Sequence, residues 1–211
     1  EKPTLTVNDI EKNINWVQIE GSDQWVSEYI FSGDGDYVVK LTYADRSENS
    51  MDTYTKEIHI DTVAPVFEVT YDNNDARNGN YYKADRTATV KVTEHNFNAE
   101  EVILTVTATD ITGAPVDISS KAYAEYVKTP ANWSQNGDVW TLNPDDSIKF
   151  DTDAIYSITL SYTDLAENEA TPYTADFVID TTIADKNNVT ITYTTSIVDL
   201  VLETVTFGFY R

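Results

Sequence analysis

An internal repeat with a period of 119 residues constrains the fold of this chain more than any other feature. Residues 37–62 read YVVKLTYADRSENSMDTYTKEIHIDT, and residues 156–181 read YSITLSYTDLAENEATPYTADFVIDT. The two stretches align without a gap and are identical at 11 of 26 positions. Self-similarity at a fixed long period is typical of tandem arrays of one structural unit. The chain is therefore expected to contain more than one copy of the same domain.

The tryptophans extend this repeat upstream. Trp16 and Trp25 of the first copy correspond, with looser spacing, to Trp133 and Trp140 of the second. All four tryptophans are thus features of the repeat, and because a tryptophan side chain buries a large area we expect them to be core residues.

Within each copy, apolar residues alternate with polar ones. This period of two is typical of half-buried antiparallel strands, and the turn sequences ADRSEN and TDLAEN separate each such strand from a second one at residues 54–60 or 173–179. Each copy is therefore predicted to end in a β-hairpin. The residues expected on the inner face of the first hairpin strand are Tyr37, Val39, Leu41 and Tyr43, and their counterparts are Tyr156, Ile158, Leu160 and Tyr162.

Composition supports an all-β protein with a real core. The chain has 211 residues, of which 41% are hydrophobic and 12% aromatic, and aromatic and β-branched side chains favour strands. The complete copy is predicted to contain seven or so short strands, which is typical of a β-sandwich. Besides the closing hairpin, these strands are expected at residues 66–71, 87–93, 102–109, 139–142 and 147–150, with helical turns after Asn98 and from Ser119.

The repeat divides the chain into three parts. Residues 1–62 match only the second half of the unit, residues 63–182 form one complete unit, and residues 183–211 resemble the opening strands of another. Half a sandwich exposes an apolar face and unpaired strand edges, which readily pair with further strands. We therefore hypothesise that residues 189–210 pair with residues 4–60, either between two chains or by folding back within one.

The net charge of the chain makes some classes of binding partner unfavourable. The net charge is −22 at pH 7, and such a negative field repels nucleic-acid phosphates and anionic lipid surfaces. No segment approaches the roughly 20 apolar residues that span a bilayer, so neither nucleic-acid binding nor membrane insertion is expected. Because carboxylates are the hard oxygen ligands that calcium prefers, Ca²⁺ is the leading cofactor candidate.

No catalytic motif is present. The chain has no cysteine, no G-x-S-x-G elbow and no dinucleotide- or phosphate-binding glycine motif. Its two histidines, His59 and His95, lack the spacing of a zinc site and are expected to be ordinary surface or loop residues. We expect no catalytic residues, and the protein is predicted not to be an enzyme.

The hairpins and the segments that follow them resemble bacterial immunoglobulin-like repeats. These often carry Y-x-D-x-A-G-N followed by F-x-[IV]-D-T-x-A-P, and the corresponding stretches here are YADRSENS with IHIDTVAP and YTDLAENEA with FVIDTT. Glu48 and Glu167 replace the usual glycine, and only the first linker has the proline, Pro65. The resemblance implies Ig-like β-sandwich repeats in a bacterial cell-surface or secreted adhesin-type protein. There they act as spacers or stalks whose partners are neighbouring repeats.

In related adhesin repeats, calcium bound by linker and loop carboxylates stiffens the junction between domains. The resemblance implies the same role here for the linker and turn residues, with oxygen ligands from residues 72–80 or backbone carbonyls completing the shell. The alternative is that these residues only cap turns and confer solubility. The residues concerned are Asp45, Glu48, Asn49, Asp61, Asp164, Glu167, Asn168 and Asp180.

A second functional hypothesis rests on residues 110–140, a segment longer than a sandwich connection needs. Long loops on rigid scaffolds often carry binding sites, and aromatic faces stack on sugars. A carbohydrate- or protein-binding module, accessory to a secreted enzyme or presenting a site for a host ligand or glycan, is the alternative function. The opposing interpretation is that this segment forms a lid over the edge of the sandwich. The aromatic residues of this segment are Tyr123, Tyr126, Trp133 and Trp140.

Overall fold

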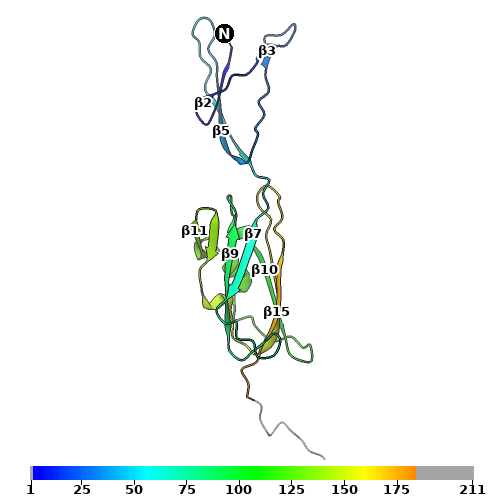
Figure 1. Ribbon diagram of the computed structural model, residues 1–211. Coiled ribbons are helices and arrows are strands. Elements are labelled where there is room, and N and C mark those ends of the chain that lie inside the picture. The colour runs from blue at the N-terminus through cyan, green and yellow to red at the C-terminus, as the bar shows by residue number, and fades with distance from the viewer. Residues whose placement is uncertain (1, 184–211) are drawn as a thin grey trace, which may run out of the picture.

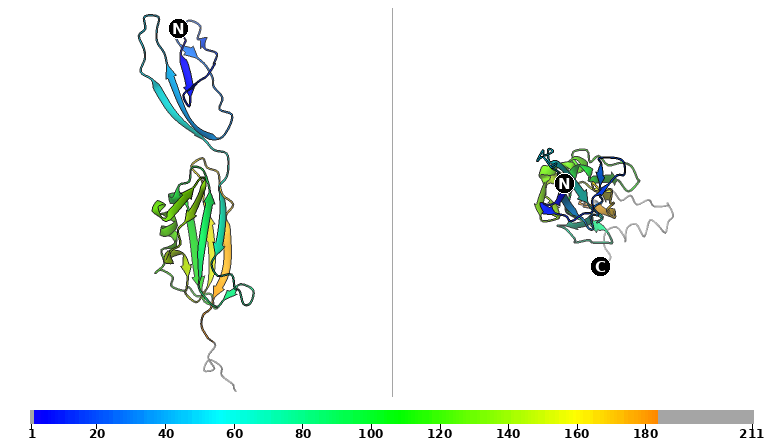
Figure 2. Two further views of the ribbon diagram at one scale, coloured as in Figure 1. Left: turned by 60° about the vertical axis from the view of Figure 1, so that its left-hand side comes forward. Right: turned by 90° about the horizontal axis from the view of Figure 1, so that it is seen from above.

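The computed structural model describes residues 2–183, which form two β-rich bodies stacked end to end (Figure 1). We call residues 2–62 unit 1 and residues 63–183 unit 2. The chain passes between them once, and Figure 2 shows that unit 1 lies over unit 2 when the molecule is viewed from above. Strands dominate both units, and the described residues contain a single short α-helix, so the predicted all-β class is confirmed. The predicted third part falls outside the described residues from position 184 onwards.

Unit 2 is a β-sandwich of two mainly antiparallel sheets. One sheet has the order β10-β14-β15-β8; the other has the order β11-β12-β9-β13, with β7 also paired to β9. The strands are β7 Val66–Tyr71, β8 Tyr81–Tyr82, β9 Arg86–Thr93, β10 Ile103–Thr109, β11 Trp133–Asn136, β12 Val139–Leu142, β13 Lys149–Phe150, β14 Ala154–Ser161 and β15 Tyr173–Ile179.

The core of unit 2 lies between these sheets. Every second residue of β9 and β14 points inwards, as the alternation in the sequence predicts, and aromatic rings fill the centre. Phe150 lies 5.2 Å, ring centre to ring centre, from Tyr123, Tyr156 and Phe177. Arg86 is buried over the rings of Tyr71 and Tyr82, and its Nε–H donates to the Asn73 backbone oxygen at 2.8 Å.

The helical pieces of unit 2 lie in its connections. They are η1 Ala99–Glu101, α1 Tyr123–Lys128, η2 Pro130–Asn132 and η3 Asp146–Ile148. The Asn98 side chain caps η1, as predicted. The helix predicted from Ser119 begins only at Tyr123, because Ser119 is used in a turn where its N–H bonds to Asp117, and the actual N-cap, Ala122, has no capping side chain.

Unit 1 contains one sheet and one small hairpin. The sheet has the order β2-β1-β5-β6, and the hairpin pairs β3 with β4. The six strands are β1 Thr4–Val7, β2 Ile10–Glu11, β3 Val17–Gln18, β4 Trp25–Val26, β5 Gly35–Thr42 and β6 Tyr54–Ile60. Val7 is the one buried hydrophobic residue among the described residues of this unit.

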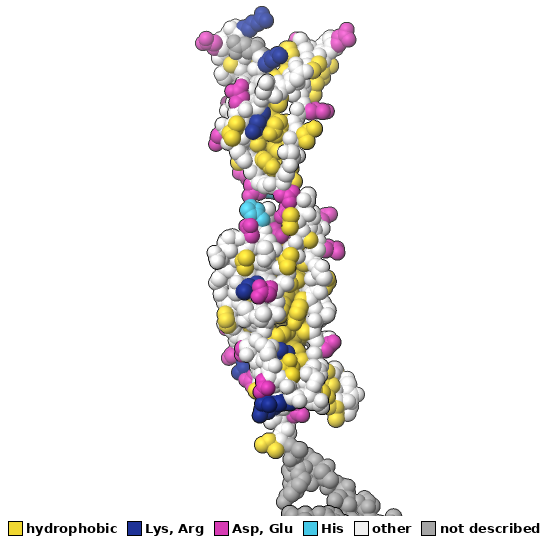
Figure 3. All heavy atoms as spheres, in the orientation of Figure 1, with side chains coloured by type: hydrophobic (Ala, Val, Ile, Leu, Met, Phe, Trp, Pro, Cys, Tyr) yellow, Lys and Arg dark blue, Asp and Glu magenta, His cyan; other side chains and the backbone are white. Residues whose placement is uncertain are grey.

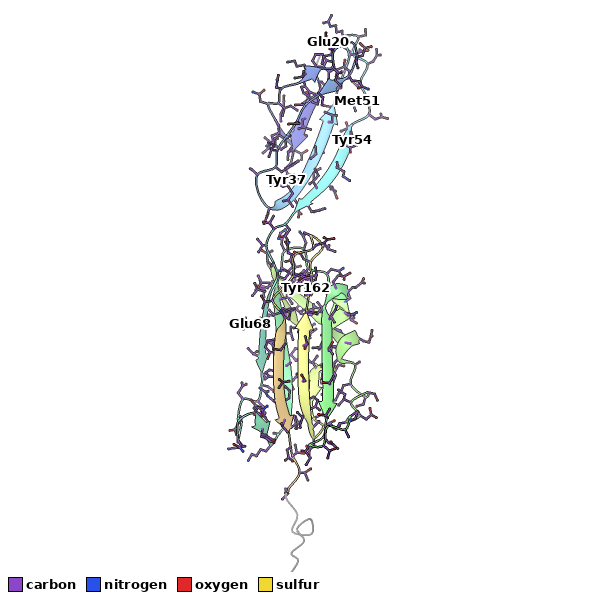
Figure 4. All side chains as sticks on the ribbon, turned by 90° about the vertical axis from the view of Figure 1, so that its right-hand side faces the viewer. Glu20, Tyr37, Met51, Tyr54, Glu68 and Tyr162 are labelled. Carbon is purple, nitrogen blue, oxygen red and sulfur yellow. The ribbon has the colours of Figure 1, made fainter. Side chains whose placement is uncertain are left out.

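The closing hairpins of the two units have the same geometry. Gly35 pairs with Ile60 in β5–β6, and Ala154 pairs with Ile179 in β14–β15, which is the same register at an offset of 119. The Tyr37 hydroxyl donates to the backbone oxygen four residues earlier over 2.8 Å, and the equivalent hydroxyl of Tyr156 does the same over 3.0 Å. These bonds have the form expected of a tyrosine corner. Figure 4 labels Tyr37 near the lower end of unit 1.

Candidate metal centre at the junction of the two units

The turn that closes each hairpin holds its aspartate through backbone hydrogen bonds. Asp164 accepts from the N–H groups of Ala166 and Asn168 at 2.8 Å, and the Asn168 amide donates to its second oxygen at 2.8 Å. Asp45 makes the same three bonds in unit 1. These bonds fix the carboxylate's position: in each turn Oδ1 accepts two of them and Oδ2 accepts one, so Oδ2 keeps a lone pair for another ligand.

A left-handed residue follows in both turns. Glu48 and Glu167 have φ values of 64° and 68°, a region that glycine occupies without strain. This explains why the related repeat pattern has glycine there. The side chain of Glu167 is exposed, so the backbone of this residue shapes the turn that holds Asp164.

The linker aspartate is also fixed by its own backbone. Asp61 follows β6 directly, and its carboxylate accepts from the N–H of Val63 at 2.9 Å. Thr62 anchors the same segment to unit 1, because its hydroxyl donates to Asp34 at 3.0 Å. The second copy repeats this arrangement with Asp180, whose carboxylate accepts from the N–H two residues later. The repeated IDT sequence is therefore a strand end followed by a hydrogen-bonded exit turn.

Three carboxylates converge where the units meet. Asp61 comes from the linker, Glu94 from the end of β9 and Asp164 from the β14–β15 turn, and one ligand oxygen from each lies within 4.8 Å of the others. Glu94 is only 4% exposed and Asp164 only 6%. Asn168 adds a contact between the units, because its amide donates to the Asp61 backbone oxygen at 3.2 Å. Figure 4 labels Tyr162, which lies near this end of unit 2.

The electrostatics of this cluster favour a cation. None of the ion pairs among residues 2–183 includes Asp61, Glu94 or Asp164. Burial raises the pKa of the Glu94 carboxyl, the N–H of Asn96 opposes this, and the charges of both aspartates raise it further. Buried carboxylates without a paired cation are unfavourable, and they are usually neutralised by a proton or a metal ion.

Space and additional oxygen atoms surround the cluster. A cavity of about 310 Å³ is lined by Asp34, Asp61, Glu94 and Asp138, among others, and a neighbouring one of about 280 Å³ includes Asp61, Asn96 and Asp164. The donors are carboxylate, amide and carbonyl oxygens, and waters in these cavities can complete a shell of six to eight ligands. This donor set fits Ca²⁺, which binds oxygen in flexible geometries.

The histidines belong to a separate network beside the cluster. The Asp36 carboxylate of unit 1 lies 2.6 Å from His59 and 3.5 Å from His95 of unit 2, while His95 also lies 2.9 Å from Asp138. Hydrogen bonding to Asp138 raises the pKa of His95. Figure 3 shows histidine and acidic side chains at the waist between the units. Both histidines are surface residues, and the contact between Asp36 and His95 connects the two units.

The structure brings some of the predicted metal ligands together and separates others. Asp61, Asp164 and Asn168 meet at the junction. The first-copy turn, with Asp45, Glu48 and Asn49, lies at the opposite end of the β5–β6 hairpin, and Asp180 lies at the far end of unit 2 (Figure 1). Residues 72–80 do not contribute, because Asp72 bonds to the N–H of Thr87 at the start of β9, whereas Glu94 follows its other end.

Glu94 was missed by the sequence analysis, although its position carries a signal. It continues the inward series of β9, which has buried residues at positions 86, 88, 90 and 92. A glutamate in the buried register of a strand requires a partner. Glu94 lies one residue beyond the end of β9, so the sequence analysis did not include it in the inward series of the strand.

The aromatic segment is part of the core region. The indole N–H of Trp133 donates to the Val127 oxygen at 2.7 Å, and that of Trp140 donates to the Glu94 oxygen at 3.1 Å. The hydroxyls of Tyr123 and Tyr126 donate to backbone oxygens as well. Tyr123 and Trp133 are buried, and the other two pack against the core. This arrangement matches the lid interpretation, in which the rings stabilise unit 2.

No protein-family model matches the chain, and no curated protein sequence matches it. Among the described residues, no helix is long and apolar enough to cross a membrane. Fold and junction geometry are therefore the observations on which a function is proposed.

Proposed function

We propose that this chain is a spacer or stalk module of a bacterial cell-surface or secreted adhesin-type protein, with calcium bound at the joint between its repeats. The observation that carries the proposal is the convergence of Asp61, Glu94 and Asp164 from two successive units. A stalk needs successive domains to keep a fixed direction, and a ligand shared between them restricts bending. The extracellular and bacterial setting comes from the resemblance of the hairpin and linker motifs.

The calcium part of the proposal follows from charge. Unit 1 supplies one carboxylate and unit 2 supplies two, and no Lys or Arg side chain among the described residues pairs with any of them. A bound divalent cation supplies positive charge and oxygen coordination at that point. It stabilises each buried carboxylate and, by drawing ligands from both sides, opposes separation of the units.

Thermal unfolding in chelator, in calcium and in magnesium tests the proposal. Binding to the native state alone raises stability by RT ln(1 + [L]/Kd), so the midpoint should rise with calcium concentration. Magnesium prefers a rigid octahedral shell at shorter distances and should raise it less. An unfolding midpoint that is equal in chelator and in calcium contradicts the calcium-bound joint.

A further inference from the structure

The strand β10 forms one edge of its sheet in unit 2. The order of that sheet is β10-β14-β15-β8, and Figure 4 shows β10 as the green strand at its edge. An edge strand presents backbone N–H and C=O groups that can pair with a further strand. The hydrogen bonds of β10 and of the segment after it show which of these groups are available.

Alternate residues of β10 direct their backbone groups away from β14. The N–H of Val116 donates to the Ala108 oxygen at 2.9 Å, so the backbone groups of Ala108 face the edge. Because backbone direction alternates along a strand, those of Val106 and Leu104 face the edge as well. Among residues 2–183, neither Val106 nor Leu104 has a backbone partner on that side. The N–H and C=O groups of both residues are therefore available to another strand.

The equivalent edge in unit 1 is paired. Leu5 of β1 is opposite Leu41 of β5. Leu104 of β10 is opposite Leu160 of β14, at the same place in the repeat, so β1 and β10 are equivalent strands. The outer edge of β1 pairs antiparallel with β2, and the N–H of Lys12 donates to the Leu5 oxygen at 2.9 Å. In unit 1, this edge of the repeat therefore accepts an antiparallel strand.

The turns that follow β1 and β10 explain the difference. Asn8 and Asp9 follow β1 directly, and their φ values of 51° and 61° are typical of a type I′ turn, which returns the chain along the strand. In unit 2, β10 continues to Thr109, and the returning segment bonds to its end, through Val116 to Ala108, before the chain leads to α1. Among the described residues, the start of β10 is left unpaired on this side.

A groove lies beside the free edge. Its volume is about 390 Å³, and it is lined by the start of β10 and by the segment that leads into α1. Ile118 and Tyr123 contribute apolar surface to it, beside Leu104 and Val106. In a strand paired with β10, the side chains opposite Leu104 and Val106 lie on the same side of the sheet as theirs. A segment with apolar residues at alternate positions therefore fits this groove.

The charges around the groove favour a basic partner. Glu125 lines the groove and Glu101 precedes β10, and neither has an ion pair among residues 2–183. Lys121 also lines the groove, but its Nζ lies 2.8 Å from the Asp151 carboxylate, which neutralises its charge. The net charge of −22 makes a second copy of this chain a poor partner. The occupant that the charges favour is a basic segment of another protein.

We infer that the edge of β10 is a docking site for an extended basic segment of another protein, which adds an antiparallel strand beside Leu104 and Val106. Backbone hydrogen bonds provide the pairing, and alternate apolar side chains enter the groove. Because the added strand is antiparallel, the residues that follow its contact with Leu104 run towards Glu101. Its basic residues therefore belong at its C-terminal side. The site lies on unit 2 alone and is independent of calcium binding at the joint.

Binding of labelled peptides to the full chain, measured by fluorescence anisotropy, is the first test. The peptide TVTITKK places its valine opposite Val106, its isoleucine opposite Leu104 and its lysines beside Glu101, so it should bind. The peptide TVTITEE should bind several-fold more weakly. Methylation of the backbone nitrogens of the valine and the isoleucine in TVTITKK removes the N–H groups that face β10, and it should abolish binding.

Protein variants test where the peptide binds. Glu101→Lys combined with Glu125→Lys reverses both unpaired charges, so this variant should prefer TVTITEE to TVTITKK. Glu28→Lys combined with Glu57→Lys makes the same change in net charge on unit 1, and it should leave the preference for TVTITKK unchanged. All four glutamates are exposed, so the substitutions leave the core intact.

Hydrogen exchange measured by NMR tests the backbone pairing. In the free chain, the amides of Leu104 and Val106 should exchange rapidly, whereas that of Thr105, which faces β14, should be protected. Saturating TVTITKK should slow the exchange of Leu104 and Val106 and leave that of Thr105 unchanged.

Three results of the peptide experiments overturn the inference. They are no binding of TVTITKK at millimolar concentration, equal binding of the methylated peptide, and a peptide preference that the reversed charges at Glu101 and Glu125 do not change. Self-association of the full chain that protects the amides of Leu104 and Val106 would assign the edge to a second copy, and it would overturn the inference as well.

Discussion

The two closing hairpins share a sequence pattern, a register and a turn, yet only one of them is buried. Leu41 and Leu160 occupy the same position opposite Tyr54 and Tyr173, but Leu160 is 1% exposed whereas Leu41 is partly exposed. Strand pairing and turn geometry are local, so both copies have them. Burial depends on a second layer, which only unit 2 has among the described residues. Likewise, Asp45 and Asp164 make the same turn bonds, but only Asp164 faces another unit.

The largest expected contrast comes from truncating the paired leucines. Leu160→Ala should destabilise unit 2 by about 3 kcal/mol, because it removes a buried side chain and leaves a cavity. Leu41→Ala should destabilise unit 1 by about 1 kcal/mol, because less apolar area is lost from contact. Hydrogen exchange read by mass spectrometry separates the two units. Equal effects in both units would contradict the difference in burial.

Replacing Glu94 by Gln should change stability in opposite directions with and without calcium. In chelator, the variant should be more stable than the wild type by about 1 kcal/mol, since it removes a buried charge beside two others but keeps the acceptor for Asn96. In calcium it should lose most of the stabilisation that binding provides, about 2.7 kcal/mol when free calcium is about 100 times the dissociation constant. Denaturant unfolding measures both. A variant that is less stable than the wild type by the same amount in both buffers would indicate a purely structural glutamate.

The turn aspartates provide a matched pair for the same site. Asp164→Asn and Asp45→Asn each keep an oxygen that accepts the two backbone N–H bonds, so each should weaken its turn by about 1 kcal/mol or less. Only Asp164→Asn should also weaken calcium binding, which titration calorimetry reports directly. If both substitutions reduce calcium affinity alike, the ion binds in the turns rather than at the junction.

The smallest expected effect is the same in both copies. Glu48→Gly and Glu167→Gly should each stabilise the protein by about 0.5–1 kcal/mol, because glycine adopts positive φ without strain. Unfolding of each variant in chelator measures the gain apart from any metal. If the gain in stability differed strongly between Glu48→Gly and Glu167→Gly, the two turns would differ in strain although their hydrogen bonds are the same.

The sequence was informative where structure is local or repeated. The predicted bounds of β6, β7, β12 and β15 are those observed, because alternation and turn residues define them. β8 was missed, since two residues that pair in parallel with β15 have no periodicity of their own. The helix predicted from Ser119 begins four residues later, at Tyr123, because Ser119 takes part in a turn with Asp117.

The site was harder to predict than the hairpins. The linker and turn aspartates could be selected, because the repeat marks them in both copies. Which of them meet depends on the direction in which successive units stack, and that is a property of the assembled chain. Asp61 and Asp164 are separated by 103 residues, and Glu94 lies just beyond the last residue of β9, where the alternation of the strand was not followed further.

The most direct test of the joint measures the distance between the two units. The chain has no cysteine, so Glu57→Cys on unit 1 and Thr105→Cys on unit 2, both exposed, give two unique sites for spin labels. In dilute protein, pulsed electron paramagnetic resonance should report a narrow distance distribution in calcium and a broader one in chelator. Adding Glu94→Gln should broaden the distribution in calcium as well. Distributions of equal width in calcium and in chelator would contradict a calcium-stiffened joint.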